Sequence, residues 1–337
     1  MAADLARDPA PDPGELAGAQ ETVEALLLGT LPHLTRGDVA EQAGVPIEVA
    51  EQLWRLLGFP RTDDEDRAFT EADVEALRLT RELMELGVLG PDSQAALVRT
   101  WGRSYARLAE WQTTLLADIA TDDPDPAHRL TELAQSVLPR VESLQSYVWR
   151  RHLASATSRA LAVESATTPV STMAVCFVDI VGYTSRSKSL AEAELVAWLE
   201  HFEDAATGIV VDRGGRMIKT IGDEVLFVAD RAEDAADAAL EMTARGADDD
   251  DPFPAVRAGI AYGDVVSRLG DVFGATVNIA ARLTSVARPG TVLVDEGCHE
   301  TLSGDDPGSP YALRRTRRVS VKGYAKLQPW VLRRAER

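Results

Sequence analysis

Two aspartates stand where apolar strands are predicted to end, and together they could hold divalent cations. Asp179 closes the run AVCFVD, and Asp223 lies in the Gly-Asp turn of MIKTIGDEVLFV. A turn alone would explain Gly-Asp, because glycine tolerates a positive φ and aspartate bonds nearby backbone. If the two acids converge, they need cations, and Mg²⁺ uses one or two carboxylates plus substrate phosphates. The pair therefore predicts two-metal chemistry at a phosphate.

Two further pairs of residues indicate nucleotide recognition. Lys219 lies four residues before Asp223, and Asp271 lies in the loop RLGDVFG. An ammonium and a carboxylate match N1 and the N6 amino group of adenine, whereas guanine reverses both functions. Asn278 and Arg282 are four residues apart and would share one helix face, where they could orient a ribose and stabilise a transferring phosphoryl group. Each pair, taken alone, also fits exposed surface side chains.

The elements that must position these residues follow the order β-α-β-β-α-β. The strand ending at Asp179 precedes a helix closed by Gly214 and Gly215, the hairpin, a second helix and another strand. This order predicts an α+β domain with a ferredoxin-like core over residues 168–337. The segment IVGYT after Asp179 turns from strand to helix, and its N–H groups could cradle a triphosphate.

The motifs FVDIVGYT, KTIGDE, GDVFGATVNIAARL and VKGY together resemble the class III adenylyl/guanylyl cyclase catalytic domain. The resemblance implies conversion of ATP to 3′,5′-cyclic AMP and pyrophosphate with two divalent cations, Mg²⁺ or Mn²⁺. That family takes its metal ligands from one subunit and its Asn/Arg pair from the other, so a homodimer is implied. The implied metal ligands are Asp179, Asp223 and the backbone carbonyl of Ile180; the substrate-binding residues are Lys219, Asp271 and Lys322; the catalytic residues are Asn278 and Arg282.

The half of the chain before this domain has helical periodicity. We expect a disordered tail over residues 1–19, an all-α regulatory domain over 20–126 and a helical connector over 127–167, which Pro139 can kink or divide. This arrangement resembles actinobacterial regulated adenylyl cyclases, which implies control of catalysis by protons or a fatty acid. His128 and His152 flank the connector, and histidine changes charge near neutral pH.

Residues 34–88 also resemble the helix-turn-helix of MerR-type regulators. The second helix of that segment is rich in acids, however, and a DNA-binding surface must be basic, so we do not expect DNA binding. Two alternatives to an adenylyl cyclase are a noncatalytic cyclase-like signalling module and a MerR-like transcription regulator. A palm-type diguanylate cyclase is a third, because GDE resembles its signature, although VNIAAR fits the first family better.

The charge and composition of the chain argue against several classes of function. The 337 residues carry a net charge of −19, which disfavours nonspecific binding to nucleic acid and to anionic membranes. The two cysteines lack metal-ligand spacing, and we expect free thiols in a reducing cytoplasm. No apolar run is long enough for a transmembrane helix, and the N-terminal stretch lacks an apolar signal core.

Overall fold

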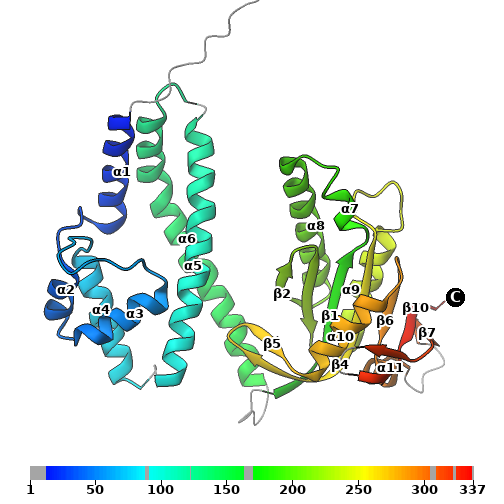
Figure 1. Cartoon of the computed structure of the whole chain (residues 1–337). Helices are drawn as coiled ribbons and strands as arrows, with labels where there is room; N and C mark the ends of the chain where they lie inside the picture. The colour runs from blue at the N-terminus through cyan, green and yellow to red at the C-terminus, as the bar shows by residue number, and fades with distance from the viewer. Residues whose placement is uncertain are drawn as a thin grey trace, which may run out of the picture. The chain divides into compact units, whose positions relative to one another are not determined.

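The computed structural model describes residues 13–87, 91–121, 123–162, 170–303, 309–321 and 324–335. The chain divides into two compact units, Met1–Val163 and Glu164–Arg337. Figure 1 shows helices in the first unit and a sheet with covering helices in the second.

The described part of the first unit is helical. Its helices are α1 (Pro13–Leu28), α2 (Arg36–Ala43), α3 (Ile47–Leu57), α4 (Glu71–Glu85), α5 (Pro91–Thr121) and α6 (Pro126–Ala162). Helix α1 starts at Pro13, earlier than the predicted end of the disordered tail at residue 19, because proline suits the first helical turn and helix formers follow it. The rest of that predicted tail, residues 1–12, lies outside the described residues.

Helices α2, α3 and α4 pack around a small core. Thr35 caps α2 in a reciprocal arrangement with Asp38, and Gly44, at φ 67°, ends the helix. Two residues then lead into α3, whose buried side chains include Leu53 and Trp54. The Trp54 ring stacks on Phe69, with ring centroids 4.6 Å apart, so the loop after α3 folds back onto this core.

The two long helices support this core. Gly102 of α5 lies so close to α3 that an added Cβ would be 2.3 Å from the carbonyl oxygen of Leu57. A glycine is therefore needed where these helices cross. Helix α6 continues through Pro139 rather than dividing there, and its packing against α1 and α5 offsets the hydrogen bond that proline removes.

The second unit contains strands and helices in mixed order. They are β1 (Val170–Ile180), α7 (Tyr183–Arg186), α8 (Glu192–Asp212), β2 (Arg216–Ile221), β3 (Glu224–Ala229), α9 (Ala232–Arg245), β4 (Val256–Arg268), β5 (Asp271–Phe273), α10 (Ala275–Val286), β6 (Val292–Val294), α11 (Glu296–Ser303), β7 (Tyr311–Arg315), β8 (Val319–Val321), β9 (Tyr324–Leu327) and β10 (Trp330–Arg334). The predicted mixed α and β domain after an all-helical region is confirmed.

The main sheet has the order β2-β3-β1-β4-β6-β10-β7, and β5 pairs with the far end of β4. Neighbours within β2-β3-β1-β4 are antiparallel, whereas β4 and β6 are parallel. Strands β8 and β9 form a separate antiparallel pair. Strand β1 therefore lies inside the sheet, between β3 and β4.

The sheet has two different faces because alternate side chains point to opposite sides. In β1, Cys176 and Val178 pack in the core that includes residues of α8 and α9. Val175 and Phe177 face the other way and pack in a core that contains Ala280 of α10. We call this second side the α10 face.

The cysteines and the apolar character of the helices were both subjects of a prediction. Cys176 and Cys298 are both free, as predicted, and both are buried. Among the described residues, no helix combines the length and the apolar character needed to cross a membrane.

Candidate active site

The two predicted metal-binding aspartates meet where β1 ends beside the β2–β3 turn. The Ile180 N–H donates a hydrogen bond of 3.2 Å to the carbonyl oxygen of Asp223. This bond fixes the hairpin tip against the end of β1, one residue after Asp179. Asp179 follows Phe177 by two residues, so its side chain belongs to the α10 face.

A row of charged side chains crosses three strands at this point. Asp179 lies opposite Glu224 of β3 and opposite Arg257 of β4. The Arg257 guanidinium donates from Nε to Oδ2 of Asp179 at 2.7 Å, and its Nη2 lies 2.6 Å from the same oxygen. The site therefore contains one arginine among three carboxylates, counting Asp223.

Burial, and after it the neighbouring negative charge, raises the pKa values of two of these acids. Burial raises the pKa of Asp223, and the nearby Asp179 carboxylate raises it further. Burial is also the main reason why the pKa of Glu224 rises to about 7, and Asp179 and Asp223 add to the effect. Carboxylates crowded so closely favour a cation between them.

The donor set of Asp179, Asp223 and the Ile180 backbone fits a hard divalent cation. Such ions take oxygen ligands, and Mg²⁺ needs few carboxylates when substrate phosphates and water complete its coordination. The described residues contain no ready-made group of three or more histidine, cysteine, aspartate or glutamate ligands. A site of this kind would therefore depend on oxygen atoms from the substrate.

The predicted base-recognition pair also comes together. The Lys219 ammonium lies 2.5 Å from Oδ2 of Asp271, although 52 positions separate the two residues. The Lys219 and Asp271 side chains are 42% and 31% exposed, so the pair is open to a ligand. The other carboxylate oxygen of Asp271 accepts a hydrogen bond from the Val272 N–H, which orients the side chain.

Two irregular backbone features position this pair. A bulge in β2 between Met217 and Lys219 sets Lys219 opposite Leu226, whose side chain packs on the α10 face. Asp271 is the first residue of β5, which pairs with β4 through a tight turn at Leu269 and Gly270. Both turn residues have a positive φ, 55° and 78°, as a two-residue hairpin of the primed type requires.

Asn278 and Arg282 lie on α10, as the spacing predicted. Asn278 is exposed and Arg282 is half-buried. Within the described residues, Arg282 forms no ion pair, so its guanidinium is available to an anionic ligand. Lys322, the predicted triphosphate-binding lysine, lies outside the described residues.

The segment after Asp179 was expected to turn into a helix whose N–H groups could cradle a triphosphate, but the helix that follows is short. Gly182, at φ 76°, leads into α7, which is a single short turn from Tyr183 to Arg186. The Arg186 guanidinium lies over the Trp198 ring, 5.0 Å from its centroid, and anchors this turn to α8.

Sequence reasoning did not assign roles to Arg257 and Glu224. A signal was present for both, since Arg257 stands within a run of apolar strand residues and Glu224 directly precedes one. Charged side chains in buried strands usually have a partner or a function. Their common neighbour, Asp179, could not be identified from sequence. The register of β1 against β3 and β4 sets Asp179 between Glu224 and Arg257.

Known proteins resemble this chain over both of its units. The family described as the adenylate and guanylate cyclase catalytic domain matches residues 165–334, and the adenylate cyclase regulatory domain matches residues 24–148. An adenylate cyclase from Streptomyces coelicolor is 37% identical over 98% of this chain and 94% of its own length. A pH-sensitive adenylate cyclase from Mycobacterium tuberculosis is 31% identical over 88% of this chain and 77% of its own length.

Solved structures with a similar fold include the adenylyl cyclase CyaB from P. aeruginosa, at 22% identity and a TM-score of 0.41, covering 50% of this chain and 96% of that one. The two family matches cover the second unit, called the catalytic unit from here on, and the N-terminal helices, and both families are domains of adenylate cyclases. The chain therefore belongs to the adenylate and guanylate cyclase family, and the prediction of an adenylate cyclase is confirmed.

Proposed function

We propose that the chain converts ATP to 3′,5′-cyclic AMP and pyrophosphate at sites shared between two identical subunits. In this reaction the ribose 3′ oxygen attacks the α-phosphorus, the bond to the bridging oxygen of pyrophosphate breaks, and the 3′ hydroxyl proton is released. The observation that carries the proposal is the Lys219–Asp271 pair on the same side of the sheet as Asp179 and α10.

Asp179 and Asp223 would hold two divalent cations, Mg²⁺ or Mn²⁺, with the backbone carbonyl of Ile180. When bound, such ions activate the attacking oxygen and neutralise the leaving pyrophosphate. Arg257 pairs with Asp179 and keeps that carboxylate oriented. The crowded carboxylates around Asp223 support this assignment, because their charge favours cations.

Lys219 and Asp271 would select adenine. The Lys219 ammonium donates to N1 of the ring, and the Asp271 carboxylate accepts from the N6 amino group. Their existing ion pair holds the donor and the acceptor side by side, so little ordering is needed when the base enters. Guanine would place a donor against the ammonium and an acceptor against the carboxylate, which leaves both groups unpaired.

Asn278 and Arg282 of a second copy would complete the site, Asn278 by orienting the ribose and Arg282 by stabilising charge on the α-phosphate. Two observations support this sharing. The Arg282 guanidinium has no acidic partner among the described residues of its own chain. Large apolar side chains near the motifs are also exposed, namely Ile221, Leu269, Phe273 and Val286. Exposed apolar groups of this kind suit a subunit interface.

Subunit complementation tests the shared site. Asp223→Ala and Arg282→Ala should each be inactive, and mixed subunits should regain activity, because each heterodimer keeps one site without either substitution. Random pairing would restore about one quarter of the wild-type activity per subunit. Verified heterodimers that stay inactive would argue against shared sites, whereas inactivity of wild-type protein toward ATP would reject the reaction itself.

We further propose that the N-terminal unit regulates the catalytic dimer, with protons or a fatty acid as signals, and that the enzyme is cytoplasmic. The match of residues 24–148 to an adenylate cyclase regulatory domain supports regulation. The order of β1, α8, β2, β3, α9 and β4, with its antiparallel pairing, supports a ferredoxin-like core.

The resemblance of α2 and α3 to a MerR-type helix-turn-helix stays a prediction, and the acids Glu48 and Glu51 on α3 oppose DNA binding.

A further inference from the structure

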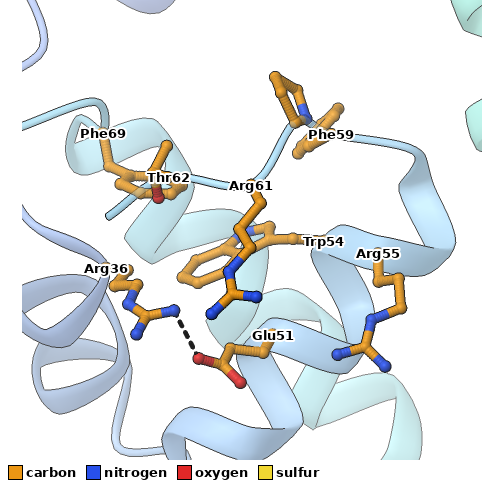
Figure 2. A pocket seen from close by; sticks show the side chains of 9 residues that line it. Arg36, Glu51, Trp54, Arg55, Phe59, Arg61, Thr62 and Phe69 are labelled. Atoms are coloured by element: carbon orange, nitrogen blue, oxygen red, sulfur yellow. Dashed lines mark hydrogen bonds and ion pairs between the residues drawn. The ribbon is translucent and has the colours of Figure 1, made fainter. Parts of the chain in front are cut away.

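A cavity of about 370 Å³ lies in the N-terminal unit, beside the end of α3. Its volume falls in the range of small-molecule sites. It is lined by Arg36, Glu51, Trp54, Arg55, Phe59, Pro60, Arg61, Thr62 and Phe69 (Figure 2). None of these residues belongs to the proposed catalytic site.

More arginines than acids line this cavity. Arg36 is paired with Glu51 at 2.7 Å, and it also contacts Asp64. Arg55 and Arg61 are exposed, and neither forms an ion pair within the described residues. Because the chain carries 54 acids against 35 lysines and arginines, two neighbouring arginines without acidic partners are an unusual local excess of positive charge.

The same cavity has an aromatic wall. Trp54 is 9% exposed and held in place by stacking on Phe69, so its position is fixed by the core. Phe59 is 52% exposed and offers a free ring face at the cavity. Figure 2 shows Arg36, Arg61 and Glu51 converging beside the Trp54 ring, with Arg55 at the rim.

We propose that this cavity binds a small planar organic anion, an aromatic ring system that carries one phosphate or carboxylate group. The ring would pack against Phe59 and Trp54, and the anionic group would bind Arg61 and Arg55. Stacking supplies an apolar contact, and charge-assisted hydrogen bonds from guanidinium supply orientation. The binding step is independent of the proposed catalytic reaction.

A bound ligand would be well placed to affect the long helices. The cavity includes Trp54 and Arg55, which are within three residues of Leu57, and Leu57 contacts Gly102 of α5. With so little space at that crossing, a shift of the α3 end must move α5 as well.

Binding to the full chain tests the proposal with two probes that differ in the anionic group, adenosine 5′-monophosphate and indole-3-acetate. Adenosine and ribose 5-phosphate serve as the ring and the anion alone. We expect at least one probe to bind more tightly than its fragments and to slow hydrogen exchange of residues 54–62, which separates this cavity from the catalytic site.

Charge reversal provides the matched comparison. Arg61→Glu with Arg55→Glu should weaken the binding of that probe by about tenfold or more and remove the protection of residues 54–62. Arg103→Glu, the same change at an exposed position of α5, should leave both unchanged. Both arginine variants alter exposed positions, and a melting temperature equal to wild type verifies their folding. Absence of protection by either probe at millimolar concentration, or equal effects of the variants and the control, would overturn the proposal.

Discussion

In the catalytic unit the sheet is covered on both faces, and its largest buried side chains, such as Phe202 and Phe227, are completely enclosed. In the N-terminal unit, α5 and α6 instead carry large apolar side chains on the outside. Trp111 is 62% exposed and Trp149 is 56% exposed, and Tyr105 and Tyr147 are similar. The catalytic unit can thus form a core by itself, while the long helices have apolar surface left to bury.

This difference fits the separate roles that we propose, catalysis for one unit and regulation for the other. A site that must hold two acids, a lysine and an aspartate in register needs a rigid sheet beneath it. A regulatory unit needs surfaces that can exchange partners, and exposed apolar stripes at helical spacing are suited to that role. Changes in the sheet should therefore affect chemistry, and changes in the helices should affect control.

The largest effect is expected from the carboxylates. Asp223→Ala should lower cyclic AMP formation by about 100-fold or more while the dimer persists, because loss of a direct metal ligand exceeds the effect of losing its neighbours. Asp249→Ala, which removes an exposed acid from the loop before β4, is the matched control. Turnover by the two variants and their size in solution are the measurements. Near-normal turnover by folded Asp223→Ala would remove the metal assignment.

Base recognition should show the next largest effect. Lys219→Glu combined with Asp271→Cys should lower kcat/KM for ATP by about 100-fold and raise the relative use of GTP, since both polar groups then mismatch adenine. Arg103→Glu in the N-terminal unit is a charge reversal that should leave ATP kinetics unchanged. If the double variant keeps wild-type kinetics with ATP, adenine is recognised elsewhere.

Removal of the N-terminal unit should have a smaller effect, on control rather than on chemistry. A chain that begins near residue 160 should have higher basal activity and a different pH profile between about pH 5.5 and about pH 8, where histidine titrates. Activities are compared only between samples verified as dimers. Identical activities and profiles would contradict regulation by this unit. A difference that persists after replacement of His128 and His152 would keep the regulation and reject these histidines as the sensor.

The smallest effect concerns the stability of the catalytic unit. The folded pKa of Glu224, about 7, lies above its ordinary value of 4.5, so the folded chain binds more protons than the unfolded chain between those values. Stability is therefore lost as pH rises from 4.5 to about 7, by on the order of 1–2 kcal/mol after allowance for partial solvent access.

Glu224→Gln should remove that loss. With a chelator present, the melting temperature of this variant should exceed that of wild type by a few degrees at about pH 8 and match it near the ordinary glutamate pKa. Glu192→Gln, at an exposed position of α8, should show no such dependence. An equal difference at both pH values would mean that Glu224 acts through packing rather than through its charge.

The sequence was sufficient to predict the order of the catalytic elements and the helical character of the N-terminal unit. Apolar runs of different period separate strands from helices, and GDE within such a run marks the hairpin. The helical spacing of Asn278 and Arg282 was enough to place both on one helix. These predictions depend on local patterns only.

Two other features depended on contacts that local patterns do not contain. The segment around Asp271 was expected to be a loop, but it forms the β4–β5 hairpin, whose Leu269-Gly270 turn lacks the usual Asn-Gly signal. The pairing of Arg257 with Asp179 requires the register of β1 against β4. Strand pairing determines both the β4–β5 hairpin and the Arg257–Asp179 pair, and no local sequence signal indicates that pairing.

The bulge in β2 has a consequence for how nucleotide preference can change during evolution. The bulge takes up one extra residue, Ile218, so that Lys219 lies opposite Leu226; if the same residues paired without a bulge, Lys219 would lie opposite Val225, which packs on the other face of the sheet. The base preference that we propose for this chain thus depends on the bulge as well as on residue identity. Deletion of Ile218 would remove the bulge and keep Lys219 opposite Leu226, whereas regular pairing of Ile218 would move Lys219 to the other face and abolish the proposed adenine recognition while leaving every recognition residue in the sequence.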